Sequence, residues 1–449
     1  MGRFAAPSSL GSVGLATVLA VGAVASWSPG AAAPTLVGWA LLPADTFADG
    51  PTSGQFVKAN PYGTLLPPYP RRQPVEGFSA GLRGVGRSFV FTTDNGFGAT
   101  DNSADFVLRL YSVRPDFRTA RGGTGAVAPG DLRLDEPLHN HGPASRIALR
   151  DPEHRLGLPI QADLGHYYGD PAAPVVDAAI RRGRLLTGAD VDPESVVLDR
   201  HCHLWFGDER GPYLVETDLS GVVLRRAIPF PGVASPESDG VRAGAEKPDL
   251  PRSGGIEGLA VDPGGERLYA LLEKRVEGDG RRLRRLAEFD VDAAAFTGAT
   301  WLYPMERSGT GASELTALDS LHFLVIEEND ETATEGVPFK KIFLASLEGV
   351  RPGGEVAKTE VVDLMDVADP DDLDGDGRTA FTFPYATTEV LLALDARTLL
   401  VANDNNFPEG GGRAARADDT EIVKIRLGRR LPGAFRRQPS LAACFAAER

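Results

Sequence analysis

The sequence predicts an all-β protein, a β-propeller that we expect to have six blades with loop insertions. Three observations lead to this fold class. Short apolar runs bounded by Gly, Pro, Asp and Asn dominate the chain after residue 34, helical periodicity is scarce there, and one acidic unit recurs along the chain. Because three or four antiparallel strands per repeat are typical of propeller blades, we interpret each copy of the unit as a blade.

Each unit opens with a glutamate, passes through a turn into an apolar strand and closes on an acid. The opening glutamate precedes the closing acid by 13 to 18 residues, which fits two strands joined by a tight turn. The five copies run from Glu76 to Asp94, from Glu194 to Asp208 and Glu209, from Glu257 to Glu273, from Glu314 to Glu327 and from Glu389 to Asp404. A third strand follows in most copies, which completes the outline of a blade.

Two stretches interrupt the repeat. Residues 114–190 are expected to hold a degenerate sixth blade and an insertion over one face, and the segment 235–253, rich in Pro and Gly, is expected to be a loop.

The repeated acids predict a cation site. The first strand of every propeller blade lines the central channel, so residues at equivalent positions point at one centre. Clustered carboxylates repel one another and are costly to bury unless they are neutralised. Oxygen ligands without Cys or His favour Ca²⁺ over Zn²⁺. The expected calcium ligands are drawn from Glu194, Asp208, Glu257, Glu314, Glu327, Glu389 and Asp404. The alternative is that these acids cap strands or bind backbone amides between blades.

Basic residues beside the acidic strand ends are candidates for binding the phosphate or carboxylate of a small anionic substrate. They are Arg109, Arg210, Lys274, Arg285 and Lys341. Asp208 or Glu209 is the expected general base for ester hydrolysis, assisted by the cation. Ser79 lies in a G-x-S-x-G pattern, but no helical run follows it as a nucleophile elbow requires, so we do not expect it to be the nucleophile.

A second acidic motif lies near the C-terminus. Residues 372–377, Asp-Leu-Asp-Gly-Asp-Gly, fit the first half of an EF-hand-like calcium loop, but the twelfth position is Phe383 where a bidentate Glu belongs. A calcium loop completed by another acid and a solvated acidic turn both remain open.

The bulk properties limit partners and location. The chain has 62 acids and 47 bases, a formal charge of -15, which disfavours nucleic acid. Residues 1–33 have the basic start, short apolar run and small residues of a signal peptide, so we expect a secreted or periplasmic monomer without a stable membrane span after its removal. Whether Cys202 and Cys444 pair stays open, because sequence does not show whether they are close.

The repeated motifs resemble the esterase-like phytase family, also called phytase-like domain proteins. The resemblance covers about residues 70–430 and is carried by Thr93–Gly98, Gly207–Tyr213, Gly255–Ala260, Glu327–Asp330 and Ala402–Phe407. It implies that residues 34–449 form a phytase-like propeller domain that hydrolyses phosphate or carboxylate esters. A non-catalytic, calcium-stabilised propeller that binds a ligand or partner is the alternative, and a lactonase of similar architecture is a third possibility.

Overall fold

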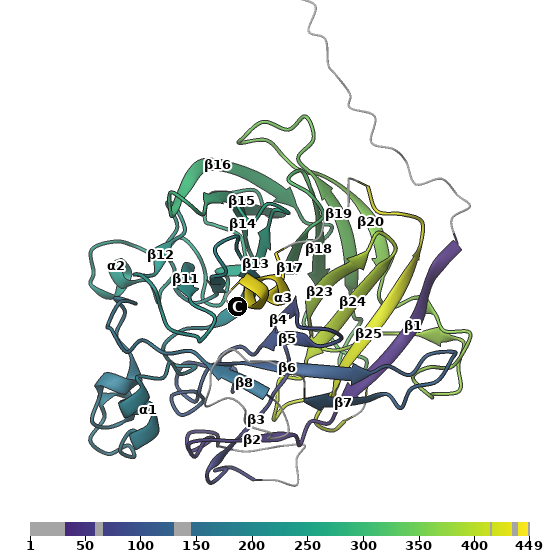
Figure 1. Ribbon diagram of the computed structural model, residues 1–449. Helices are drawn as coiled ribbons and strands as arrows, with labels where there is room; N and C mark the ends of the chain where they lie inside the picture. Colours follow the sequence, from purple (N-terminus) through teal and green to yellow (C-terminus); the bar gives the residue numbers. More distant parts are fainter. Residues whose placement is uncertain (1–31, 59–65, 130–144, 414, 433–438, 448–449) are drawn as a thin grey trace, which may run out of the picture.

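Several inner and second strands of this protein are buried on both faces. The computed structural model describes residues 32–58, 66–129, 145–413, 415–432 and 439–447 (Figure 1). In β9 (Pro193–Leu198), β10 (Leu204–Asp208) and β13 (Ile256–Val261), every residue is buried. Strands covered on both faces read as continuous apolar runs rather than as an alternating pattern. Each small sheet therefore packs against a neighbouring sheet on both sides, as propeller blades do, and the predicted fold class is confirmed.

Three blades are regular four-stranded antiparallel sheets, each built from consecutive strands. Blade 2 contains β9, β10, β11 (Tyr213–Thr217) and β12 (Ile228–Pro229). Blade 3 contains β13, β14 (Arg267–Leu272), β15 (Leu283–Asp290) and β16 (Ala295–Pro304). Blade 4 contains β17 (Gly311–Ala317), β18 (His322–Glu328), β19 (Lys340–Ser346) and β20 (Ala357–Asp363).

The other two blades join the ends of the chain. Blade 5 contains β23 (Thr387–Asp395), β24 (Thr398–Asp404) and β25 (Thr420–Gly428), and the N-terminal strand β1 (Ala32–Leu42) completes it by antiparallel pairing with β25. Blade 1 contains β4 (Ala80–Arg83), β5 (Phe89–Thr92) and β6 (Arg109–Asp116), and its outer edge is shared by β7 (Ala126–Pro129) and β8 (Ser145–Ala148). The predicted signal peptide lies outside the described residues, except that Ala32 and Ala33 begin β1.

The innermost strands form a closed ring. They contact one another in the order β4, β9, β13, β17, β23 and back to β4. Across the described ranges the ring therefore has five blades, and the predicted sixth is not confirmed. The stretch 114–190 instead supplies β7, β8 and a side lobe with the short helices η2 (Gln161–Asp163), η3 (Tyr167–Gly169) and α1 (Ala178–Gly183).

Smaller elements decorate the ring. The segment 235–253 is a loop, as predicted, apart from the one-turn helix α2 (Asp239–Arg242). Strands β2 (Phe47–Asp49) and β3 (Arg72–Pro74) form a separate two-stranded sheet, and the hairpin of β21 (Val367–Ala368) and β22 (Ala380–Phe381) lies beside β1. Among the described helices, none has the length and hydropathy that crossing a bilayer requires.

The C-terminal helix α3 (Leu441–Ala447) closes one end of the central channel (Figure 1). Residues at its start line a pocket together with Leu82, Ala317 and Leu394, which lie at or near the ends of inner strands β4, β17 and β23. A disulfide joins Cys444 in this helix to Cys202 in the turn between β9 and β10, which answers the question that the sequence left open. The opposite end of the channel is where the inner strands begin, and there the repeated acids gather.

Candidate metal and hydrolytic site

Three glutamates occupy the same structural position in three blades. Glu194 in β9, Glu257 in β13 and Glu389 in β23 are each the extra residue of a β-bulge, skipped when the inner strand pairs with the second strand. A bulge bends its strand and re-aims the side chain of the extra residue. The repeat in the sequence thus has a local cause in the backbone, and these side chains converge on the axis of the ring.

The three side chains form a compact group. Carboxylate oxygens of Glu194, Glu257 and Glu389 lie within 4.8 Å of one another, and each residue is only 6% exposed. The Oε2 atoms of Glu257 and Glu389 have no hydrogen-bond partner among the described residues. Burial raises the pKa of all three carboxyl groups well above the ordinary value, and neighbouring carboxylates raise it further.

Two further groups extend this acidic surface. Asp94 and Asp192 approach Glu194, and Glu209 and Glu273 approach Glu257, again with oxygens within 4.8 Å in each group. We call Asp94, Asp192, Glu194, Glu209, Glu257, Glu273 and Glu389 the central acid cluster. Sequence reasoning did not select Asp94, Asp192 or Glu273 as ligands, although Asp94 and Glu273 close their repeats and Asp192 lies two residues before Glu194.

Two other predicted ligands act mainly on the backbone. Asp208 Oδ1 accepts from the Asp192 amide at 2.9 Å, and its Oδ2 accepts from the Gly211 amide at 2.9 Å. Asp404 Oδ1 accepts from the Asn406 amide at 2.9 Å. Burial raises the pKa of both carboxyl groups to about 6, while these amide hydrogen bonds lower it. Their geometry fits the alternative role of capping strand ends, although Asp404 also raises the pKa of Glu389.

Glu314 and Glu327 are offset by one residue from the cluster. In blade 4 the bulge residue is Ser313, so Glu314 pairs regularly with Ile326 and its Oε1 accepts from the Leu315 amide at 2.6 Å. Burial raises the pKa of Glu314 without a contribution from another carboxylate. The structure does not bring Glu314 into the central acid cluster.

Glu327 was wrongly assigned to the channel. Its Oε1 accepts from the Tyr303 hydroxyl at 2.7 Å and is paired with Lys358, and its Oε2 accepts from the Glu306 amide at 2.7 Å, all on the side of blade 3 and the outer strand. Successive strand residues point to opposite faces. Glu328 therefore faces blade 5, where its carboxylate accepts from the Thr388 amide and pairs with Lys340 at 3.2 Å.

Two of the five predicted substrate-binding cations reach the cluster. Arg210 is 6% exposed, its Nε lies 3.3 Å from Asp192 Oδ2, and its Nη1 and Nη2 find no hydrogen-bond partner within the described ranges. Lys274 lies 3.1 Å from Glu273 and also donates to the Ser253 carbonyl. Both cations are therefore placed to meet an anionic group at the acids.

The other three predicted cations lie elsewhere. Arg285 pairs with Asp279 at 2.8 Å, and Lys341 pairs with Glu360 and Asp363 at 2.8 and 3.0 Å. Both project from third strands, β15 and β19, which stand away from the axis. Arg109 is buried beside the Tyr111 hydroxyl at 3.5 Å, near the Arg146–Asp49 ion pair. Closeness to an acid in the sequence does not show how far from the axis of the ring a strand lies.

Of the two expected general bases, Glu209 is the better placed. Asp208 uses both oxygens on backbone amides, whereas Glu209 is partly exposed and belongs to the group with Glu257 and Glu273. Burial raises the pKa of Glu209 well above its ordinary value, the charges of Glu273 and Asp192 raise it further, and Lys274 lowers it.

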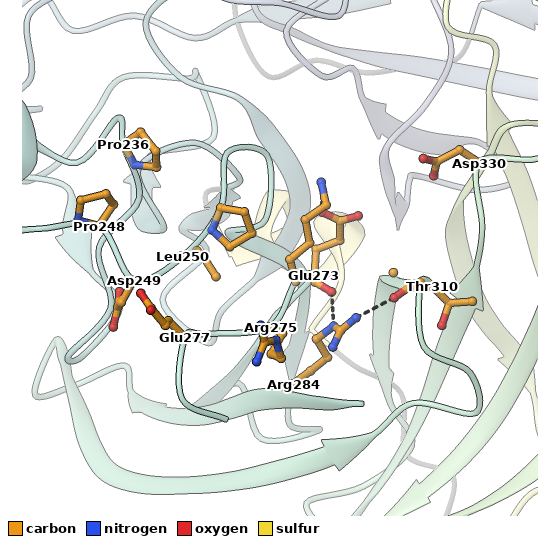
Figure 2. Close-up of a pocket in the computed structure, with 14 residues that line it drawn as sticks. Pro236, Pro248, Asp249, Leu250, Glu273, Arg275, Glu277, Arg284, Thr310 and Asp330 are labelled. Atoms are coloured by element: carbon orange, nitrogen blue, oxygen red, sulfur yellow. Dashed lines mark hydrogen bonds and ion pairs between the residues drawn. The ribbon is translucent and has the colours of Figure 1, made fainter. Parts of the chain in front are cut away.

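A pocket of about 710 Å³ adjoins the cluster (Figure 2). Pro236 and Pro248 of the 235–253 loop border one side, and Thr310 and Asp330 border the other. Arg284 fixes the floor by donating to the Glu273 and Thr310 carbonyls. Glu273, a member of the cluster, and its partner Lys274 both line the pocket, so the pocket lies directly beside the acids.

The raised pKa values predict how stability depends on pH without metal. A carboxyl group whose folded pKa lies above its unfolded value stabilises the fold at low pH, and that stability is lost as pH rises through the folded pKa. We expect chelator-treated protein to melt at least about 5 °C lower at pH 8 than at pH 5. Calcium should remove most of this fall in a thermal scan. If the chelated protein melts at the same temperature at pH 5 and pH 8, the carboxyl groups of the cluster do not have the raised pKa values on which this prediction rests.

Comparison with known proteins gives the family. The family model described as "Phytase-like: Esterase-like activity of phytase" matches residues 73–407. An uncharacterized secreted protein of Arthroderma benhamiae is 24% identical over 216 residues, which are 40% of this chain and 42% of that protein. The match thus spans less than half of that relative's length.

Solved structures with similar folds share little sequence with this chain. The periplasmic gluconolactonase PpgL of Pseudomonas aeruginosa is 13% identical, with 90% of this chain and 98% of that one covered and a TM-score of 0.34. The β-propeller domain of Cps50 from Myceliophteria thermophila is 10% identical, with 78% and 85% covered and a TM-score of 0.31. From the family match, which spans well over half of its residues, this chain belongs to the phytase-like family.

Proposed function

We propose that this protein is an exported, calcium-dependent hydrolase of phosphate or carboxylate esters, with its reaction centre at the central acid cluster. One observation carries the proposal: Glu194, Glu257 and Glu389 bring carboxylate oxygens within 4.8 Å of one another, and two of these side chains have a buried oxygen without a partner in the described structure. Such a set is unfavourable alone and fits a hard cation that prefers oxygen ligands.

Calcium bound there supplies charge neutralisation and polarisation of an ester oxygen. The chain's own groups supply the rest. Glu209 is the group placed to accept the proton of an attacking water, because it lies beside Glu257 and Glu273 and Asp208 uses both of its oxygens on backbone amides. Lys274 and Arg210 hold the anionic part of the substrate, because both cations lie at the acids and Arg210 keeps two nitrogens without hydrogen-bond partners among the described residues.

Export is supported by three separate features. The N-terminal pattern is typical of a signal peptide, the Arthroderma relative is a secreted protein, and the Cys202–Cys444 disulfide is of the kind that persists in oxidising compartments.

The test is a panel of phosphate monoesters, acyl esters and lactones, assayed with calcium and with chelator. We expect turnover of at least one ester class that chelator abolishes and calcium restores. Lactone opening without phosphatase or esterase activity would show that the substrates are lactones and not the proposed esters. Turnover that is the same with and without chelator would show that the reaction does not depend on calcium.

A binding protein without catalysis is the second candidate. It is favoured by the acids that serve the backbone, Asp208, Asp404 and Glu328, because these tie strand ends and blades together. It predicts a large rise in melting temperature with calcium and no turnover on any member of the panel.

A further inference from the structure

The hairpin loop between β21 and β22, residues 369–379, is a second place where acids converge. The hairpin stands beside β1, the strand that completes blade 5, since Ala368 in β21 pairs with Thr35 in β1. The Asp369 amide donates to the Thr379 carbonyl at 2.9 Å and so closes the base of the loop. The loop contributes no member to the central acid cluster.

The acid that completes the group is Asp369, which precedes the D-x-D-x-D-G motif. Oxygens of Asp369, Asp372 and Asp374 lie within 4.8 Å of one another. Asp369 is 1% exposed, and its Oδ1 has no hydrogen-bond partner among the described residues. Its Oδ2 accepts from the Leu373 amide at 2.7 Å, which fixes the carboxylate and leaves Oδ1 without a donor in the described structure. A buried carboxylate oxygen left in this state calls for a ligand.

The rest of the loop is held by backbone amides and by the core: Asp372 Oδ1 accepts from the Gly377 amide at 2.9 Å, and Asp374 Oδ1 accepts from the Asp376 amide at 3.2 Å. Leu373 is 3% exposed in the hydrophobic core, and its carbonyl accepts from Arg118 at 3.1 Å. The nearest cation to Asp374 is Arg413, at 4.0 Å, and Arg413 is already paired in bidentate fashion with Glu421 at 2.6 and 2.7 Å. Within the described loop, one long ion pair to a guanidinium already engaged by Glu421 is thus set against three carboxylates.

We propose that the 369–379 loop binds one calcium ion through Asp369, Asp372 and Asp374, at a site separate from the central channel. Calcium is the choice because all three ligands are carboxylates and the site lacks His and Cys. The missing Glu of an EF-hand-like loop is replaced by an aspartate from before the loop. The proposal is independent of the proposed hydrolytic function.

The site has a structural consequence. An ion that binds only the folded state stabilises it by mass action. The hairpin pairs with β1, and β1 completes blade 5 by pairing with β25. Calcium in the loop would thus reinforce the edge of blade 5 at which the N-terminal strand β1 pairs with β25.

The test compares Asp374→Asn with Asp371→Asn, a change of the same charge at an exposed residue of the same loop. Calcium titrations of the chelator-treated full chain should show that Asp374→Asn binds one ion fewer, or binds that ion at least about 10-fold more weakly, while Asp371→Asn matches the parent. Glu257→Gln should leave this site intact, which separates it from the central cluster. Identical titrations for Asp374→Asn and the parent would overturn the proposal.

Proteolysis gives a second, local readout of the site. The Arg378 side chain is 78% exposed in the loop, so trypsin can cleave after it. Calcium should slow this cleavage at least about 10-fold in the parent, and the protection should disappear in Asp374→Asn with an unchanged circular dichroism spectrum. Cleavage after Arg378 at one rate with and without calcium refutes the site.

Discussion

Replacing Glu257 by glutamine should lower calcium-dependent turnover at least about 100-fold. Loss of a residue that only hydrogen-bonds a metal ligand costs about 10- to 100-fold in metal affinity or activity, and loss of a ligand itself should cost at least as much. Glu257 is the strongest choice because it belongs to two of the acid groups, with Glu194 and Glu389 and with Glu209 and Glu273. Glutamine keeps the size of the side chain and removes its charge. The measurement is turnover of the best ester in the panel against calcium concentration.

The matched control is Glu314→Gln. Glu314 is equally buried, at 5% against 6% exposed, and lies at the same point of the sequence repeat, but its carboxylate is apart from the other acids. It should leave calcium affinity within about 2-fold of the parent. The melting temperature in chelator gives a second comparison. Without calcium, Glu257→Gln should melt higher than the parent, because it removes one of the carboxylates that repel one another. Equal losses in both variants would point to general damage of the ring.

The sequence was sufficient for the fold class and for the three glutamates of the bulges. A residue that recurs at equivalent positions of a repeat can be recognised from the sequence alone, and Glu194, Glu257 and Glu389 recur in this way. Glu314 was misplaced because blade 4 has Ser313 at the bulge, a shift of one residue in β17. Glu327 was misplaced because the acid of β18 that faces blade 5 is the next residue, Glu328. Hydrophobic patterns do not resolve such a shift in strands that are buried on both faces.

The sequence also did not show how far each strand lies from the axis of the ring. Arg285 and Lys341 follow acidic strand ends in the chain, yet they belong to third strands and pair with Asp279, Glu360 and Asp363. The blade count failed for a related reason, since nothing local in residues 114–190 distinguishes a degenerate blade from an outer edge plus a side lobe. Both features depend on which strands the chain brings together over long separations.

Removing the disulfide should cost about 2–5 kcal/mol of unfolding free energy. The bond joins residues 242 positions apart, so its loss frees a very long loop in the unfolded chain. It also releases α3, in which Leu441 is fully buried while most of the remaining short helix lies at the surface. We expect Cys202→Ala combined with Cys444→Ala to unfold at lower denaturant concentration than the oxidised parent, and the reduced parent to behave like the double variant.

The same variant separates the two ends of the channel. Helix α3 lies where the inner strands end, at Leu82, Ala317 and Leu394, whereas the acids lie where those strands begin. Loss of the disulfide should therefore lower stability while leaving calcium affinity within about 2-fold of the parent under conditions where the variant is folded. A parallel loss of calcium binding would mean that α3 sets the spacing of the inner strands along their whole length, and that the helix supports the site rather than only closing the channel.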